Sequence, residues 1–340
     1  MQSSVKLLKK LKEQHDKLAV SVLVGAGFSK NAIKKYPGWD ELLRDLVAEV
    51  YGRQIEERYR QYKSGNGPYY YTEELFREKE IENIIHDVGY LDLVSKYIQD
   101  KGYREAIDVY IEDHLPYVEE ANGMFKVTNM PDVPFNARNL DVHKELLLCK
   151  WKHVYTTNYD NLLELANDIH GMDYRKITVD YKLTELSEHR GIVKVHGSLV
   201  GDSLSKDYEF DNDKSRRYII SAEDYATYAE KHQAFSYQMK TGLLTGVFCL
   251  IGFSGNDPNF LGWLEWMKDV LDRDVTDPNK EATKVYLLTI GEQKIEKSRQ
   301  LFYQNHHIGL INILDSAVLK LIGAQPDIKD VGAIFTMLFR

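Results

Sequence analysis

A glycine-rich turn near the N-terminus is the first segment whose residue types suggest chemistry. Gly25-Ala26-Gly27-Phe28-Ser29 follows the apolar run 18–24. Glycines let a backbone approach a pyrophosphate closely, and the amides that follow can point at its oxygens. Lys30 stands where the dinucleotide-binding fingerprint has a third glycine. The pattern predicts a pyrophosphate site, and the alternative is a tight strand-to-helix turn without a ligand.

Two further apolar runs end in polar residues. The first leads into Thr157, Asn158, Tyr159 and Asp160, and the second ends in His196. Asn158 could hold ribose hydroxyls or a water, whereas Asp160 is better suited to cap the next helix. A histidine with an ordinary pKa of about 6.5 suits proton transfer at neutral pH, although a lone histidine is more often structural.

A fourth run ends in Gly252-Phe253-Ser254-Gly255-Asn256-Asp257-Pro258. Asp257 can cap a helix that has Pro258 in its first turn, and that helix start offers a second place for a phosphate or ribose. Residues beyond the carboxyl ends of parallel strands meet at one crevice in an open α/β sheet. We therefore expect the four turns to form one site.

The elements that position these turns are short apolar strands separated by helical patterns. Strands are expected at 18–24, 153–156, 176–179, 191–196, 218–220, 246–253, 284–290 and 308–313, and helices at 161–169, 223–238 and 259–271. Several runs lack alternation, as strands buried on both faces do. The pattern predicts an α/β fold, a Rossmann-like parallel sheet with helices on both faces.

A long segment between the first two strands has mostly helical periodicity and contains no convincing strand. Because a crossover does not need such a length, we interpret 40–138 as a helical insertion subdomain over the open end of the sheet. The nucleotide-binding core is then 18–39 and 139–313, within a single domain of 1–340. The last ten residues are apolar and lack a cap, so the chain could be one module of a longer protein.

Composition excludes several classes of function. The net charge of -8 argues against a direct nucleic-acid partner. Two cysteines cannot build a disulfide framework or a four-thiolate zinc site, so we expect a reducing cytoplasm and no metal. No apolar stretch reaches the ~20 residues that cross a bilayer. The basic N-terminal pattern is interpreted as an amphipathic helix packed on the domain, with a membrane-surface helix as the alternative.

The four turns together resemble those of the sirtuin-like proteins. Thr156-Thr157-Asn158-Tyr159-Asp160, Lys194-Val195-His196-Gly197-Ser198, Ile219-Ile220-Ser221-Ala222-Glu223-Asp224-Tyr225 and the 252–258 turn are most similar to the bacterial NAD-hydrolase branch of anti-phage defence effectors. Deacetylase members carry a four-cysteine zinc module, which this chain lacks, and Thr157 replaces their glutamine.

The resemblance implies roles for individual residues. His196 would accept a proton, Asn158 would orient ribose and water, and Asp160 would support both. The pyrophosphate would lie at the first turn, including Phe28, with Thr157 and Gly252 nearby. Ser254 and Thr289 would lie on the adenosine side, and Asp257 would also bind the nucleotide.

The resemblance further implies that NAD is the substrate and that the products are ADP-ribose and nicotinamide. Depletion of NAD would arrest an infected cell, as in abortive infection. Such an activity needs control, so we expect a homo-oligomer, a partner protein or a further C-terminal domain, with the insertion as interface or as a plain lid. The alternatives are a module that binds NAD or ADP-ribose without turnover, and an NAD-dependent protein deacylase.

Overall fold

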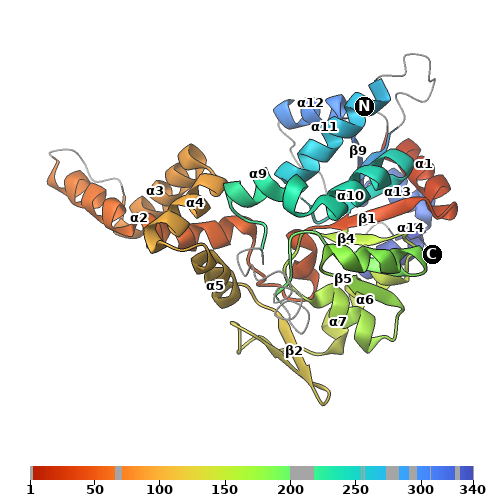
Figure 1. Cartoon of the computed structure of the whole chain (residues 1–340), viewed down its shortest axis with the longest axis horizontal. Coiled ribbons are helices and arrows are strands. Elements are labelled where there is room, and N and C mark those ends of the chain that lie inside the picture. The colour runs from red at the N-terminus through yellow and green to blue at the C-terminus, as the bar shows by residue number, and fades with distance from the viewer. Residues whose placement is uncertain are drawn as a thin grey trace.

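A seven-stranded parallel sheet forms the centre of the computed structural model. The structure describes residues 3–65, 71–199, 218–253, 255, 257–272, 283–290, 297–306, 308–325 and 330–339. The strands lie in the order β5-β6-β4-β1-β7-β8-β9 (Figure 1). They are β1 (Val20–Val24), β4 (Val154–Thr156), β5 (Tyr174–Ile177), β6 (Arg190–Lys194), β7 (Val247–Ile251), β8 (Val285–Thr289) and β9 (Ile308–Asn312). The predicted α/β class and parallel sheet are confirmed.

Strand β1 lies where the strand order changes direction. It pairs with β4 on one side and with β7 on the other, with Val22 opposite both Val154 and Cys249. Later strands extend outward from these two neighbours. In open parallel sheets the ligand crevice forms outside the carboxyl ends of the strands at such a switch point. The carboxyl ends of β6, β4, β1, β7 and β8 therefore lie side by side, in this order, along one edge of the sheet.

Helices cover both faces of the sheet, as predicted. On one face lie α1 (Ser4–Asp16), α6 (Asp141–Leu148), α7 (Leu162–Ile169), α13 (Ser316–Ile322) and α14 (Val331–Phe339), and on the other lie α9 (Ala222–Lys231), α10 (Gln233–Thr245), α11 (Pro258–Asp272) and α12 (Lys297–Asn305). The alternation within β1 explains the two cores: Val22 and Val24 pack in the first and Leu23 in the second.

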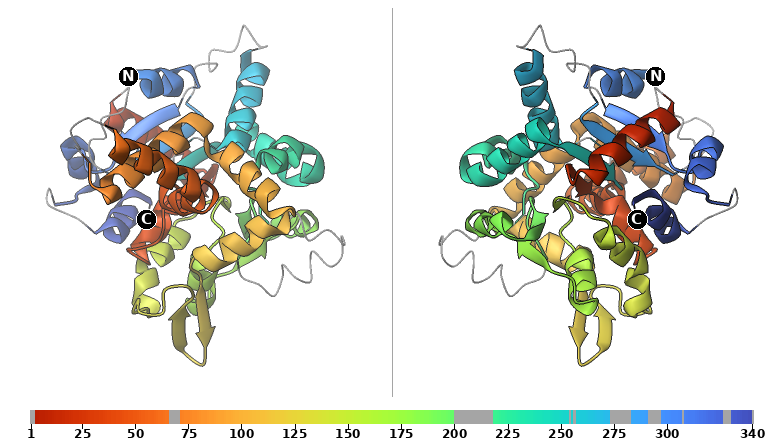
Figure 2. Two further views of the ribbon diagram at one scale, coloured as in Figure 1. Left: turned by 90° about the vertical axis from the view of Figure 1, so that its left-hand side faces the viewer. Right: turned by 90° about the vertical axis from the view of Figure 1, so that its right-hand side faces the viewer.

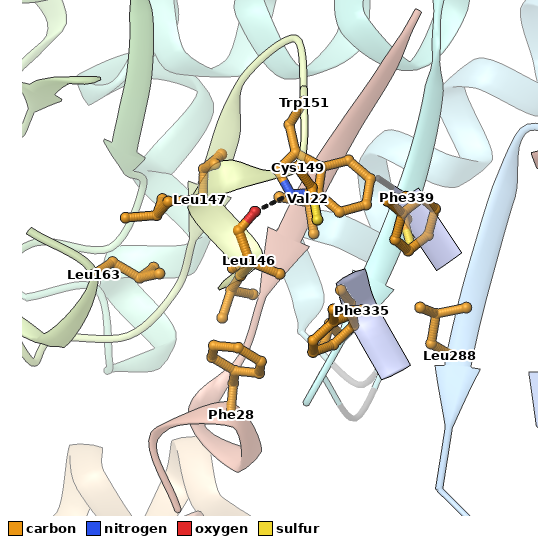
Figure 3. Packing of buried hydrophobic residues seen from close by; sticks show 14 of the residues in the cluster. Val22, Phe28, Leu146, Leu147, Cys149, Trp151, Leu163, Leu288, Phe335 and Phe339 are labelled. Atoms are coloured by element: carbon orange, nitrogen blue, oxygen red, sulfur yellow. Dashed lines mark hydrogen bonds between the residues drawn. The ribbon is translucent and has the colours of Figure 1, made fainter. Parts of the chain in front are cut away.

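The first core reaches the glycine turn. Phe28 of that turn packs against His143, with ring centroids 4.8 Å apart. It also packs against Phe335 of α14, with ring centroids 6.0 Å apart (Figure 3). The indole of Trp151 closes the other end of this core and donates a hydrogen bond to the Leu146 carbonyl at 2.8 Å (Figure 3). Burial of each large apolar side chain stabilises the fold by about 1.5–3 kcal/mol.

The N-terminal helix α1 is amphipathic and packs on the domain, as predicted. It buries Leu7, Leu8 and Leu11 in the first core, and Ser3 caps its start by accepting from the Lys6 amide. None of the helices that the structure describes combines the length and apolar character needed to span a membrane.

The segment between β1 and β4 is a mainly helical layer with its own core. It contains α2 (Trp39–Ser64), α3 (Glu73–Val88), α4 (Tyr90–Lys101) and α5 (Glu105–His114). Helices α2 and α3 extend away from the sheet (Figure 1) and face the viewer in the left view of Figure 2. The domain boundaries expected from the sequence, with 40–138 as a separate insertion, stay a prediction.

The expectation that this segment has no strand is wrong. An antiparallel hairpin joins β2 (Val118–Ala121) and β3 (Met124–Val127) and projects from the foot of the molecule in Figures 1 and 2. Asn122 and Gly123 form its turn at positive φ, 55° and 77°. Asn-Gly is the strongest short hairpin signal, so the sequence contained a marker that helical periodicity alone could not detect.

Two local expectations are corrected by the structure. Residues 218–220 form no strand, because their backbone groups bond to neighbouring loops and side chains, as in Ile219 N to His196 O. The helix expected at 223–238 is two helices that meet at His232. The glycine turn leads into a helix, as expected, and this helix is a six-residue 3₁₀ helix, Ala26–Asn31.

Candidate active site

A cleft of about 870 Å³ lies at the carboxyl edge of the sheet, against β1. Its walls come from the strand-end turns and from the helical layer. Ten of the residues predicted for the site line it: Gly25, Ala26, Gly27, Phe28, Thr157, Asn158, His196, Gly252, Asp257 and Thr289. Ser29 and Asp160 lie buried behind this wall, and Ser254 lies outside the described residues. Residues separated by more than 260 positions thus share one cavity.

The glycines of the first turn allow two loops to lie against each other. A Cβ on Gly25 would lie 2.5 Å from the Gly252 carbonyl oxygen, and one on Gly27 would lie 3.0 Å from it. The Gly27 amide donates to that same oxygen at 3.0 Å, and the Gly25 amide donates to Ile251. These two amides are committed to the β7 loop. The glycines therefore first serve loop packing, and the absent side chains also leave the turn open to the cleft.

Asn158 is held by a chain of buried hydrogen bonds. Its Nδ2 donates to Ser29 Oγ at 3.1 Å, and Ser29 Oγ donates to Asp160 Oδ2 at 2.7 Å. Its Oδ1 is buried and has no hydrogen-bond partner within the described residues. An unpaired buried carbonyl oxygen costs about 1–3 kcal/mol, so this acceptor is suited to a hydroxyl or a water brought by a ligand.

Asp160 supports the loop from behind. Its Oδ1 accepts from the Leu162 amide at 3.1 Å, at the first residue of α7, although the N-cap of this helix is Asn161 and not Asp160 as the sequence suggested. Its backbone carbonyl accepts from Lys194 Nζ, and that fully buried ammonium also pairs with Glu164 at 3.0 Å. Burial, together with the Asp160 carboxylate, raises the pKa of Tyr36 well above its usual value.

His196 lies in the wall of the cleft beside Asp257. Its Nε2 is buried, lacks a hydrogen bond and lies 3.5 Å from Asp257 Oδ2. Its ring meets the ring of Tyr225 edge to face, with centroids 5.6 Å apart. Burial lowers the pKa of His196 below 6.5, and the Asp257 carboxylate opposes that change. The imidazole is therefore neutral near pH 7 and can accept a proton.

Asp257 caps α11, as predicted. Its Oδ1 accepts from the Phe260 amide at 2.8 Å, while Oδ2 accepts from Tyr225 Oη at 3.1 Å. Tyr225 is a site residue that sequence reasoning quoted only as part of a motif. Burial raises its pKa well above 10, which keeps the phenol protonated as a donor to the carboxylate.

The helical layer contributes side chains that the sequence analysis missed. Trp39 and Tyr90 line the cleft, with ring centroids 5.8 Å apart at 64°. Burial and the nearby Asp257 carboxylate raise the pKa of Tyr90 to about 12. Leu43, Ile85 and Leu115 complete this apolar wall. Their spacing within the helices is that of ordinary core residues, so only the tertiary arrangement identifies them.

The arrangement combines an unpartnered acceptor, a neutral base and an aromatic wall. Among the residues described, no group of three or more His, Cys, Asp or Glu side chains is placed to bind a metal. Asn158 and His196 line the same cavity, and Asn158 Oδ1 and His196 Nε2 are among the buried polar atoms that have no hydrogen-bond partner within the described residues. A ribose or a water offers suitable hydroxyl groups, so these residues fit the sugar of a nucleotide.

The topology of the sheet and the glycine turn define a Rossmann-like α/β protein. Residues 152–311 match the family model of the SIR2-like domain. The matched range is a little under half of the chain, and this part of the chain is similar to a SIR2-like domain. This range includes three of the four turns on which the sirtuin-like resemblance rested, and the resemblance is confirmed at this level.

Two curated proteins are distant homologues. Defense-associated sirtuin 2 of Bacillus subtilis is 25% identical over 309 residues, which is 91% of this chain and 24% of that protein. NAD(+) hydrolase ThsA of Acinetobacter baumannii is 29% identical over 147 residues, which is 42% of this chain and 28% of that protein. The chain spans about a quarter of the length of these relatives.

Proposed function

We propose that the protein hydrolyses NAD to ADP-ribose and nicotinamide. The observation that carries this proposal is the pair of buried, unpartnered atoms, Asn158 Oδ1 and His196 Nε2, in the cleft beside the glycine turn. The SIR2-like domain implies NAD as the nucleotide, and one distant relative is named as an NAD(+) hydrolase. With its buried base, the site is suited to bond cleavage more than to binding alone.

The reaction breaks the bond between the ribose C1 atom and the nicotinamide nitrogen. Nicotinamide leaves with the bonding electron pair, and the oxygen of a water bonds to the same carbon. Asn158 Oδ1 accepts a hydrogen bond from that water or from a ribose hydroxyl, and His196 takes the proton before releasing it to solvent. Asp160 and Ser29 keep the asparagine in place, and no metal is required in this scheme.

We propose Thr289 and Ser254 for the adenosine side of the nucleotide-binding surface, and Asp257 for the part of that surface next to His196. Thr289 ends β8 and lines the cleft. The pyrophosphate lies along the turn from Gly25 to Phe28. These positions lie at the carboxyl ends of the strands, where open parallel sheets bind their ligands.

The biological role follows from the class of relatives. One relative is named as a defense-associated sirtuin, so we propose that this protein depletes NAD in anti-phage defence and acts in the cytoplasm by abortive infection. Both cysteines are buried free thiols, which suits a reducing compartment. We propose control by homo-oligomerisation, by a partner protein or by further sequence beyond this chain.

The test is to incubate the purified chain with NAD, after separating its oligomeric states by size, and to quantify nicotinamide by chromatography. We expect His196→Ala and Asn158→Ala each to lower the rate at least ~100-fold, because removal of a positioned base or orienting group has effects of this order. His189→Ala, whose side chain lies outside the cleft, is the matched control.

Thermal unfolding of each variant shows whether its fold is intact. Full activity in either folded cleft variant would refute the residue assignment. NAD binding without nicotinamide release by any oligomer would favour a sensor. Release that depends strictly on an added acyl-lysine peptide would favour a deacylase.

A further inference from the structure

We infer that Asp257 is a positioning residue for His196: its carboxylate fixes the imidazole in the cleft wall and stabilises the imidazolium that forms when the ring takes a proton. The effect of Asp257 on catalysis rests on the proposed hydrolysis of NAD. The geometry beneath it is independent of that activity, because it consists of contacts within the folded chain.

The two oxygens of Asp257 have different partners. Oδ1 accepts from the Phe260 amide at 2.8 Å and so anchors the carboxylate to the first turn of α11. Oδ2 accepts from Tyr225 Oη at 3.1 Å and lies 3.5 Å from His196 Nε2. The helix cap thus fixes one oxygen, which leaves the second directed at the histidine.

The ring of His196 is confined on its other sides by aromatic groups. Tyr225 and Tyr228 of α9 both meet it edge to face, with centroid distances of 5.6 and 6.1 Å. His196 is 3% exposed, so a charge on its ring would be poorly solvated. A carboxylate at 3.5 Å supplies the compensation that water cannot supply there.

Several other titratable groups face this pair. They are Asp224, Tyr225 and Tyr228 of α9, His232 after that helix, Tyr90 of α4 and Tyr159 of the β4 loop. Burial raises the pKa values of Tyr225, Tyr90 and Tyr159, so these three phenols are neutral near pH 7. Asp224 is already paired with Arg104 at 2.8 Å, and a charge on His232 would oppose that on His196. Asp257 is therefore the carboxylate that acts most strongly on the pKa of His196, and it opposes the effect of burial.

Tyr90 connects this pair to the helical layer. The Asp257 carboxylate and burial together raise the pKa of Tyr90, which begins α4 directly after Gly89 at φ 78°. Tyr90 itself lines the cleft, so the environment of Asp257 includes a side chain of the helical layer.

The test compares the wild type with Asp257→Asn. Asparagine caps helices as well as aspartate does, so the start of α11 is preserved while the charge is removed. The primary readout is the pKa of His196, measured by NMR on protein with isotopically labelled histidine, with His196→Ala used to assign the signal. We expect the pKa of His196 to fall by about one to three units, as for loss of an opposite charge at this distance.

The second readout is the pH profile of nicotinamide release. We expect the acid limb of kcat/KM to move to lower pH by the same shift. We also expect kcat at neutral pH to fall by about 10–100-fold with a smaller change in KM, because the carboxylate acts when the ring gains charge. Asp315→Asn, which alters the equivalent cap of α13, is the matched control and should leave both readouts unchanged.

The outcomes separate the two proposals. An active wild type with the pKa of His196 and the acid limb unchanged in Asp257→Asn would overturn the positioning role and leave the proposed function standing. An inactive wild type in which Asp257→Asn still lowers the pKa of His196 would overturn the proposed function and leave the positioning role standing. If Asp257→Asn does not fold, Asp257→Ser gives the same comparison, since serine is also a good cap.

Discussion

One added methyl group at Gly252 tests the contact between the glycine turn at Gly25–Ser29 and the loop that follows β7. Gly252 lies at φ 62°, and a Cβ at this position would be 2.4 Å from the Phe28 backbone nitrogen and 3.0 Å from the Gly27 carbonyl carbon. All of these are backbone atoms, so no flexible side chain can move aside. Gly252→Ala must therefore separate the β7 loop from the glycine turn.

The expected cost has two parts. An alanine forced into the left-handed region loses about 1–2 kcal/mol. Overpacking of a tight contact adds about 1–3 kcal/mol. We therefore expect Gly252→Ala to lower the free energy of unfolding by about 2–5 kcal/mol, a large part of the 5–15 kcal/mol that stabilises a typical domain.

Urea denaturation followed by fluorescence measures this change. Gly323→Ala is the matched control, because Gly323 ends α13 at φ 72° and an added Cβ would meet nothing within 4 Å. The control should lose only about 1–2 kcal/mol from the backbone conformation. Equal losses in the two variants would refute the argument that the loops need contact without side chains.

Two further predictions concern buried ionisable groups. Lys194→Met leaves the Glu164 carboxylate without its 3.0 Å partner, so we expect a loss of about 3–5 kcal/mol in urea denaturation. Adding Glu164→Gln should recover part of it, and an unchanged stability in the single variant would contradict this reasoning. Burial lowers the pKa of His143 to about 4, against about 6.5 in the unfolded chain, so the unfolded state binds more protons between these values. Stability should fall by about 3 kcal/mol as the pH drops from 6.5 to 4, and His143→Leu should show a smaller fall; equal pH dependence in both proteins would rule out this linkage.

The sequence by itself determined the class of fold. Non-alternating apolar runs such as 18–24 and 246–253 can be buried on both faces only in a covered parallel sheet, and each run is a strand in the structure. Polar residues just beyond the runs, including Asn158 and His196, could be proposed as one site because parallel strands end at one edge. The hairpin at 118–127 was missed because its local turn signal was outweighed by the helical pattern around it.

Only the tertiary structure decided which of the predicted residues line the cleft and which support those residues from behind. Ser29 lies buried behind the cleft wall, where it holds Asn158 and is itself held by Asp160, although the resemblance placed Ser29 at the pyrophosphate. The first glycine turn packs against Gly252, a contact across more than 220 residues. Trp39 and Tyr90 joined the site without any sequence signal. Local periodicity specifies which face of an element is buried, but the neighbour on that face depends on strand order, which only the folded chain defines.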